Sequence, residues 1–225
     1  MQGKYDPRRS KLDIRPEHNK VNYIDAIIED AAEWFKPYAE IISVIGYGNH
    51  ETAILKNLET DMIQRFVERL NTIANPTNKV HVGGYGGWII TRFNNSENGG
   101  RQNYRIKYHH GYGGGGPVTK GTIQHNRFST YIEGADCIWM GHVHEDYEMT
   151  YSVETLKSNF KTKQKDIMML RTASYKEEYD DGFGGFHIER GRPVKPLGGR
   201  WLEIYLQFTD NKIVEAKSYS YRTKN

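Results

Sequence analysis

The sequence has little of what would place it outside the ordinary globular proteins. It contains one cysteine, Cys137, which excludes an internal disulfide and suits a reducing compartment. No apolar run approaches the roughly 20 residues that a membrane span requires. Residues 1–20 are mostly charged or polar and lack the apolar centre of a secretory signal. We therefore expect a cytoplasmic protein without a membrane partner.

The sequence also has no large excess of charge of either sign. The 31 Lys and Arg residues nearly balance the 28 Asp and Glu residues, so the net charge of +3 leaves nucleic acid open as a partner without indicating it. Hydrophobic residues make up 37% of the 225 positions, which is enough for a buried core. No segment repeats at a fixed spacing. This composition predicts a single globular domain, residues 1–225.

Two stretches in the first half have the three- and four-residue apolar spacing of a helix. The first, residues 17–35, ends before Pro37, and the second, residues 54–73, ends before Pro76. Between them, residues 41–45 form a short apolar run rich in β-branched side chains. Such a run predicts a buried strand.

The rest of the chain alternates between strand and helix patterns and then becomes rich in strands. A further helix is expected over residues 119–133. Strands are expected over residues 79–93, 104–108, 137–140, 148–153, 166–173, 201–208 and 213–221, with a turn at 209–211. This order predicts an α/β fold, a layered sandwich of mixed sheets flanked by helices.

Three short polar segments each follow an expected strand. They are residues 48–51 (Gly-Asn-His-Glu), 109–111 (His-His-Gly) and 141–145 (Gly-His-Val-His-Glu). Ligand sites of open α/β sheets gather at the carboxyl ends of strands, so these segments are candidates for one shared site. Imidazole nitrogen and amide oxygen suit divalent Mn, Fe, Zn or Ni. The three segments therefore predict a site for a divalent transition metal.

In this order, the three segments resemble the signature of the calcineurin-like metallophosphoesterases. The resemblance covers roughly residues 41–145, the motif-bearing part, and leaves residues 146–225 as a β-rich C-terminal part. It implies the layered metallophosphoesterase sandwich and a phosphoester substrate. It also implies hydrolysis of phosphomonoesters or phosphodiesters by a hydroxide that a pair of metal ions activates.

The resemblance assigns roles to individual residues. Asn49, His110 and His142 would bind one ion of the pair, and His144 would bind the other. His50 would be the catalytic residue, which contacts the scissile phosphate and either stabilises the transition state or protonates the leaving group.

Other residues of these segments carry expectations of their own. Glu51 and Glu145 are placed where a carboxylate could orient an imidazole from outside the ligand set. His109 and His110 are adjacent candidates for one ligand position, and we favour His110 because Gly111 follows it.

Two leading segments of the family signature, Asp-x-His and Gly-Asp, do not occur before Gly46. In the family these segments carry the carboxylate that bridges the two ions. We therefore expect an N-terminally shortened member that lacks one or two leading strands, binds one metal ion or none, and hydrolyses phosphoesters poorly. Missing strands would also expose a sheet edge, through which a homodimer could form.

Two other functions remain open from the sequence. The chain could be a catalytically inactive metallophosphoesterase-like module for binding or assembly. It could also be a nuclease-type member that acts on nucleic acid, for which a strong salt dependence of binding would be the sign.

Overall fold

A computed structural model describes residues 15–94, 101–176, 188, 191, 193–207 and 213–223. The chain divides into two compact units, Met1–Gly86 and Gly87–Asn225, and each is described here by itself. Whether they make up the single domain expected from the sequence stays a prediction. Among the described residues, no helix has the length and apolar character needed to span a membrane.

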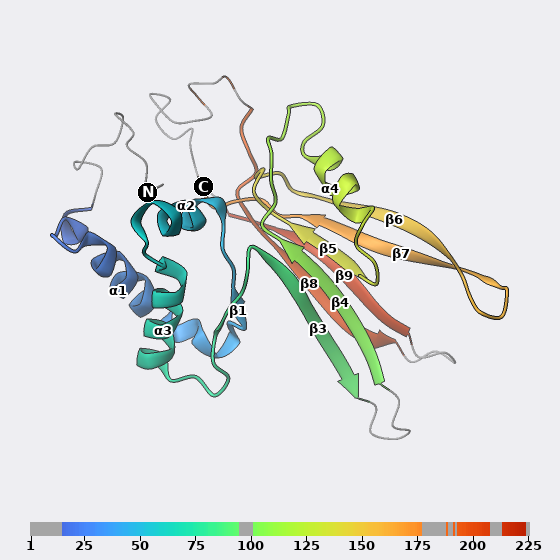
Figure 1. Cartoon of the computed structure of the whole chain (residues 1–225), viewed down its shortest axis with the longest axis horizontal. Helices are drawn as coiled ribbons and strands as arrows, with labels where there is room; N and C mark the ends of the chain where they lie inside the picture. Colours follow the sequence, from blue (N-terminus) through green and yellow to red (C-terminus); the bar gives the residue numbers. More distant parts are fainter. Residues whose placement is uncertain are drawn as a thin grey trace. The chain divides into compact units, whose positions relative to one another are not determined.

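The first unit is mostly helical. Its elements, in chain order, are the 3-10 turn η2 (Pro16–His18), α1 (Tyr23–Phe35), the 3-10 helix η3 (Lys36–Ile41), β1 (Val44–Ile45), α2 (Asn49–Leu58), α3 (Met62–Ala74) and β2 (His81–Val82) (Figure 1). The strands β1 and β2 pair in parallel, and the two helices α2 and α3 connect them. Its buried core is formed by Ala32, Ala39, Val67, Leu70 and Val80.

Three sequence predictions in this unit were wrong in their extent. The expected helix over residues 17–35 is the 3-10 turn η2 and, after residues 19–22, the helix α1, which begins only at Tyr23. The expected strand over residues 41–45 is only two residues long, because η3 continues to Ile41, whose side chain is 80% exposed. The expected helix over residues 54–73 is two helices. The break is set by Glu59, whose backbone is left-handed (φ 51°), and by Asp61, whose side chain accepts a hydrogen bond from the backbone N–H of Gln64 and so caps α3.

The second unit contains a mixed five-stranded sheet and a separate hairpin. Its elements are β3 (Gly86–Asn94), β4 (Arg101–His109), α4 (Thr122–Ser129), β5 (Cys137–Met140), β6 (Tyr147–Leu156), β7 (Thr162–Arg171), β8 (Gly198–Gln207) and β9 (Ile213–Arg222). The sheet order is β3-β4-β5-β7-β6; β4, β5 and β7 run parallel, and β6 runs antiparallel to β7. The strands β8 and β9 form an antiparallel hairpin.

The strand predictions for this unit were largely confirmed. The strand over residues 137–140 has its expected bounds, and the four strands beyond it are present with somewhat different ends. The expected strand over residues 79–93 is two strands, β2 and β3, and α4 is shorter than residues 119–133. The expected turn at 209–211 lies outside the described residues.

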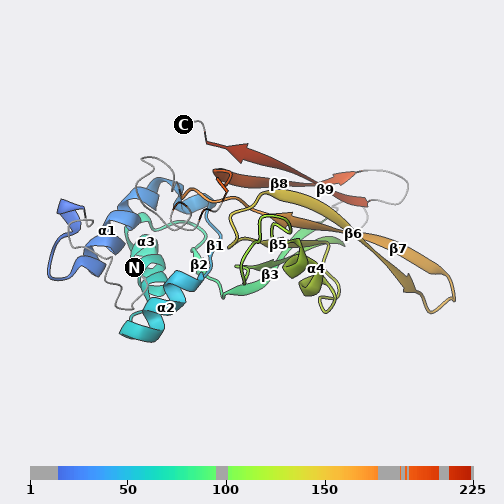
Figure 2. The ribbon, with the colours of Figure 1, turned by 90° about the horizontal axis from the view of Figure 1, so that it is seen from above.

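The five-stranded sheet is covered on both faces, as Figure 2 also shows for α4 and for the β8–β9 hairpin. Alternate residues of a strand point to opposite faces, and this sorts β5 and β7 into two sets. Ile138, Met140 and Met169 pack with Phe128 of α4, whereas Cys137 and Leu170 pack with the inner face of the hairpin. The coarse prediction of a mixed α/β fold with several sheets is therefore confirmed, whereas the layered metallophosphoesterase sandwich that lacks its leading strands stays a prediction.

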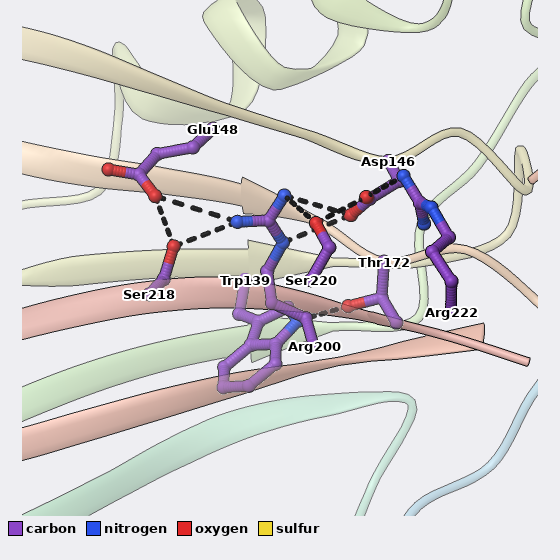
Figure 3. A network of polar contacts seen from close by, with 8 residues as sticks. All are labelled: Trp139, Asp146, Glu148, Thr172, Arg200, Ser218, Ser220 and Arg222. Carbon is purple, nitrogen blue, oxygen red and sulfur yellow. Dashed lines mark hydrogen bonds and ion pairs between the residues drawn. The ribbon is translucent and has the colours of Figure 1, made fainter.

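A buried polar network also connects the hairpin to the sheet (Figure 3). The Asp146 side chain is only 2% exposed, and it accepts hydrogen bonds from Arg200 Nη2 at 2.8 Å and from Ser220 Oγ at 2.6 Å, while Arg222 pairs with it as well. Burial opposes ionisation of Asp146, but the hydrogen bonds and the Arg200 charge outweigh it and lower the pKa of this carboxyl. The network therefore holds an ionised carboxylate directly after residues 141–145.

Candidate metal centre

Two of the predicted ligands lie side by side where parallel strands end. The β4–β5 register pairs His109 with Met140, so the residues that follow, His110 and Gly141, meet at one edge of the sheet. The backbone N–H of Gly141 donates to His110 O at 3.1 Å. Beyond it, His110 Nε2 and His142 Nδ1 form a hydrogen bond at 3.1 Å, in which one of the two nitrogens donates and the other accepts, and both rings are half-buried. The structure thus brings His110 and His142 together from 32 positions apart in the chain.

His109 has a different environment from His110. Its Nδ1 accepts a hydrogen bond from the backbone N–H of Gly111 at 2.9 Å, and its ring centroid is 4.9 Å from that of Phe128. Burial, with the nearby charges of Lys107 and Arg171, lowers the pKa of His109. Of the two adjacent histidines, His110 is therefore the one placed beside His142.

Glycine at position 111 is required by this close approach. Its φ is +105°, a conformation that other residues rarely adopt. A Cβ there would lie 2.7 Å from Gly141 O and 2.8 Å from His142 Cβ. Any larger residue at this position would therefore push His142 away from His110.

Residues 141–145, which we call the histidine loop, contain an unusual backbone. His142 and His144 both have left-handed conformations, with φ of 74° and 57°. This conformation costs roughly 1–2 kcal/mol for a residue with a Cβ. Between them, buried Val143 lies against Gly115 and Gly121, where an added Cβ would be within 3.2 Å and 2.9 Å of its side chain. The loop therefore holds two histidines in a conformation that folding alone disfavours.

The buried guanidinium of Arg171, which the sequence analysis missed, supports this loop. Arg171 is the last residue of β7, and its side chain has no exposed surface. Its Nη1 donates to Gly141 O at 2.6 Å and its Nη2 to Gly121 O at 3.0 Å. The available signal was a charged residue directly after the apolar run at 167–170. The sequence alone, however, does not show which groups Arg171 would contact.

Arg171 also starts a chain of hydrogen bonds with one possible direction. Its Nε donates to Tyr147 Oη at 3.3 Å, and the Tyr147 hydroxyl donates to His125 Nδ1 at 3.3 Å, because a neutral His125 has to use its other nitrogen to donate to a carbonyl oxygen. His125 Nε2 then carries the proton and donates to Ile138 O at 3.1 Å. Burial and the charge of Arg171 lower the pKa of His125 to about 4, which keeps this histidine neutral. It is a buried residue with hydrogen-bond partners at both ring nitrogens.

The two glutamates have partners of their own. The Glu145 carboxylate pairs with the Lys195 ammonium, and both side chains are nearly buried. Glu51 accepts a hydrogen bond from the backbone N–H of Gly48 at 2.9 Å, the carboxylate half of a capping box at the start of α2. The expected role of both glutamates in orienting an imidazole stays a prediction.

The remaining predicted site residues lie in the first unit. Asn49 and His50 occupy the first turn of α2, directly after the loop that follows β1, with Asn49 half-buried and His50 exposed. Their convergence with the histidines of the second unit stays a prediction.

The geometry of His110 and His142 fits two ligands of one divalent cation. With metal–nitrogen bonds of about 2.05 Å, two nitrogens at this separation subtend about 100° at the metal, between octahedral and tetrahedral angles. Within the described ranges, however, no three or more His, Cys, Asp or Glu side chains form a group that could hold a metal. The expected roles of His110, His142 and His144 as metal ligands stay predictions.

Comparisons of the chain with protein-family models, curated proteins and solved structures found no match. The histidine geometry and the three sequence segments are therefore what any assignment of function depends on.

Proposed function

We propose that this chain is a metallophosphoesterase-type protein that binds one divalent transition metal through His110 and His142. The 3.1 Å separation of His110 Nε2 and His142 Nδ1 carries the proposal. The two left-handed histidines support it, since strained residues persist at functional sites when the surrounding structure enforces them. Arg171 and Gly111 provide that enforcement here.

The residues would divide the work as follows. His110 Nε2 and His142 Nδ1 share a hydrogen bond, and both would become ligands once a cation displaces the proton between them. Asn49, as the resemblance implies, would offer a side-chain oxygen as third ligand. His50 would contact the phosphate and either stabilise the transition state or deliver a proton to the leaving oxygen. A divalent cation, when bound, supplies Lewis-acid activation of water and neutralises charge on the phosphoryl group.

This ligand set limits both affinity and activity. All three proposed ligands are neutral, so no anionic group offsets the charge of the ion. A second ion near His144 would meet repulsion from the first with little compensation. We therefore propose one metal site of modest affinity and phosphoester hydrolysis that is slower than the resemblance to the family implies.

Calorimetric titration with Mn²⁺ tests the metal site. We expect a single site in the unaltered chain, and no binding by His110→Ala or His142→Ala because each variant removes one of two close ligands. His81→Ala, an exposed histidine of β2, is the matched control and should bind as before. Two tight sites, or unchanged binding by His142→Ala, would contradict the proposal.

Hydrolysis of an aryl phosphodiester separates an enzyme from an inactive binding module. We expect a slow, Mn²⁺-dependent rate that His50→Ala lowers by about 10²-fold or more, because general acid catalysis contributes on that scale. A rate indistinguishable from that of His50→Ala would assign the chain to the inactive module instead.

A further inference from the structure

The far end of the β6–β7 hairpin stands apart from the rest of the sheet. All residues from 154 to 164 are exposed, on both faces of the two strands. Figures 1 and 2 both show β6 and β7 continuing as a two-stranded ribbon beyond the neighbouring strands. We call residues 154–164 the β6–β7 tip. Because it covers no core, its side chains are available to a partner.

The β6–β7 tip and the residue after it carry an unusual charge. Residues 154–165 contain four lysines and one acidic residue, Glu154, which leaves 27 basic and 27 acidic residues in the rest of the chain. Lys165 pairs with Asp136, whereas Lys157, Lys161 and Lys163 form no ion pair among the described residues. The positive excess of the whole chain is therefore concentrated at this one place.

The placement of two of these lysines lowers the stability of the hairpin. The ladder ends at Leu156 opposite Thr162, so Lys157 and Lys161 are the next cross-strand pair, and the N–H of Lys157 donates to Lys161 O at 2.9 Å. Like charges directly opposite each other destabilise a hairpin. A bound polyanion would remove this repulsion.

Phe160 is a second unfavourable feature of the β6–β7 tip. Its N–H donates to Lys157 O at 2.9 Å, which closes the turn, and its φ is 59°, in the left-handed position that such hairpins usually give to glycine. Its side chain is 89% exposed, so it contributes almost nothing to the core. A large aromatic residue in a strained position, in contact only with solvent, is poorly explained by folding.

We propose that the β6–β7 tip binds double-stranded DNA. A two-stranded β-ribbon has the width that a DNA groove admits. Lys157, Lys161 and Lys163 would contact phosphates along the groove, and Phe160 would insert its apolar ring against a base step, as apolar wedges of DNA-bending proteins do. This proposal requires neither the metal site nor hydrolysis.

Fluorescence anisotropy with a labelled duplex of about 30 base pairs tests the proposal, with chelator present and salt varied between roughly 50 and 200 mM. The variant Lys157→Gln/Lys161→Gln/Lys163→Gln should bind about tenfold more weakly or worse. Its plot of log affinity against log salt should be less steep by about 2.7, because three phosphate contacts are lost.

The matched control moves the same charge change to exposed lysines elsewhere, in Lys20→Gln/Lys56→Gln/Lys217→Gln. It should bind within about twofold, because the proposal gives these three lysines no phosphate contact. Equal losses in both triple variants, or an unchanged tip variant, would overturn the proposal. His142→Ala should bind the duplex as the unaltered chain does, so a failed metal site leaves this result unaffected.

Phe160→Gly isolates the aromatic ring. Glycine suits the left-handed position, so this variant should unfold at the same temperature or higher while it bends an end-labelled duplex less, as seen by energy transfer. An unchanged bend would refute the role of Phe160. Stronger tip-dependent binding to single-stranded DNA, or to phosphatidylserine vesicles, would overturn the choice of duplex DNA as the partner.

Discussion

The two ends of the β6–β7 hairpin differ in how they hold positive charge. At the end beside the histidine loop, the Arg171 guanidinium is fully buried and donates hydrogen bonds to three oxygen atoms, none of them a carboxylate. At the β6–β7 tip, three lysines are exposed and unpaired among the described residues. Burying a cation is costly unless its donors are satisfied, so we assign the Arg171 guanidinium a structural role. The three lysines of the tip remain solvated at little cost in free energy and are available to bind a partner.

Both ends nevertheless contain side chains in left-handed backbone positions. His142 and His144 lie in the loop that Arg171 supports, and Phe160 lies at the turn of the tip. At one end the strain is enforced by buried contacts, and at the other it sits in solvent. The comparison indicates that the first strain holds a site rigid, whereas the second presents a side chain outward.

The largest expected effect comes from removing the buried charge. Arg171→Met should lower the free energy of unfolding by about 3–5 kcal/mol, because it removes three hydrogen bonds from a charged donor, each worth about 1.5–3 kcal/mol, and replaces the guanidinium with a side chain that cannot donate. Lys163→Met at the tip should change it by less than about 0.5 kcal/mol. Urea denaturation measures both. Similar values for the two variants would remove the distinction between the ends.

The next effect is a pH dependence at the buried end. The pKa of His125 falls from 6.5 to about 4 on folding, so the unfolded chain binds more protons between these values. The stability from neutral His125 is complete above about pH 6.5 and is lost as the pH falls toward about 4, by about 3 kcal/mol in total.

His125→Gln tests this pH dependence. It should be less stable than the unaltered chain at neutral pH and should lose less stability than that chain on acidification. Denaturation curves across this range measure the difference. Parallel losses in both proteins would show that His125 is not the group responsible.

The smallest expected effect concerns the left-handed backbone positions that both ends of the hairpin contain. Glycine tolerates a left-handed backbone and alanine does not, so His142→Gly should be more stable than His142→Ala by about 1 kcal/mol. The same order and size are expected for Phe160→Gly against Phe160→Ala. Thermal unfolding compares each pair, and an alanine variant as stable as its glycine counterpart would mean that no strain is stored there.

Local patterns predicted the elements but not their interruptions. The strand at Cys137–Met140 was readable because its apolar run is short and bounded. The break between α2 and α3 was not, because apolar residues continue at helical spacing through it while Asp61 supplies a cap that periodicity does not reveal.

The site was predictable only where strand ends determine it. Parallel pairing of β4 and β5 places His110 beside residues 141–142, and the sequence pattern was enough to expect this. Arg171 and Lys195 were missed because their importance comes from burial and from partners that are far away in the sequence. Neither quantity can be read from the residues around them.

The most direct test of the metal site is anomalous diffraction at the zinc absorption edge, on crystals of the chain grown with Zn²⁺. The account predicts one peak about 2.1 Å from both His110 Nε2 and His142 Nδ1. A peak at other residues, or none between these two nitrogens, would contradict it.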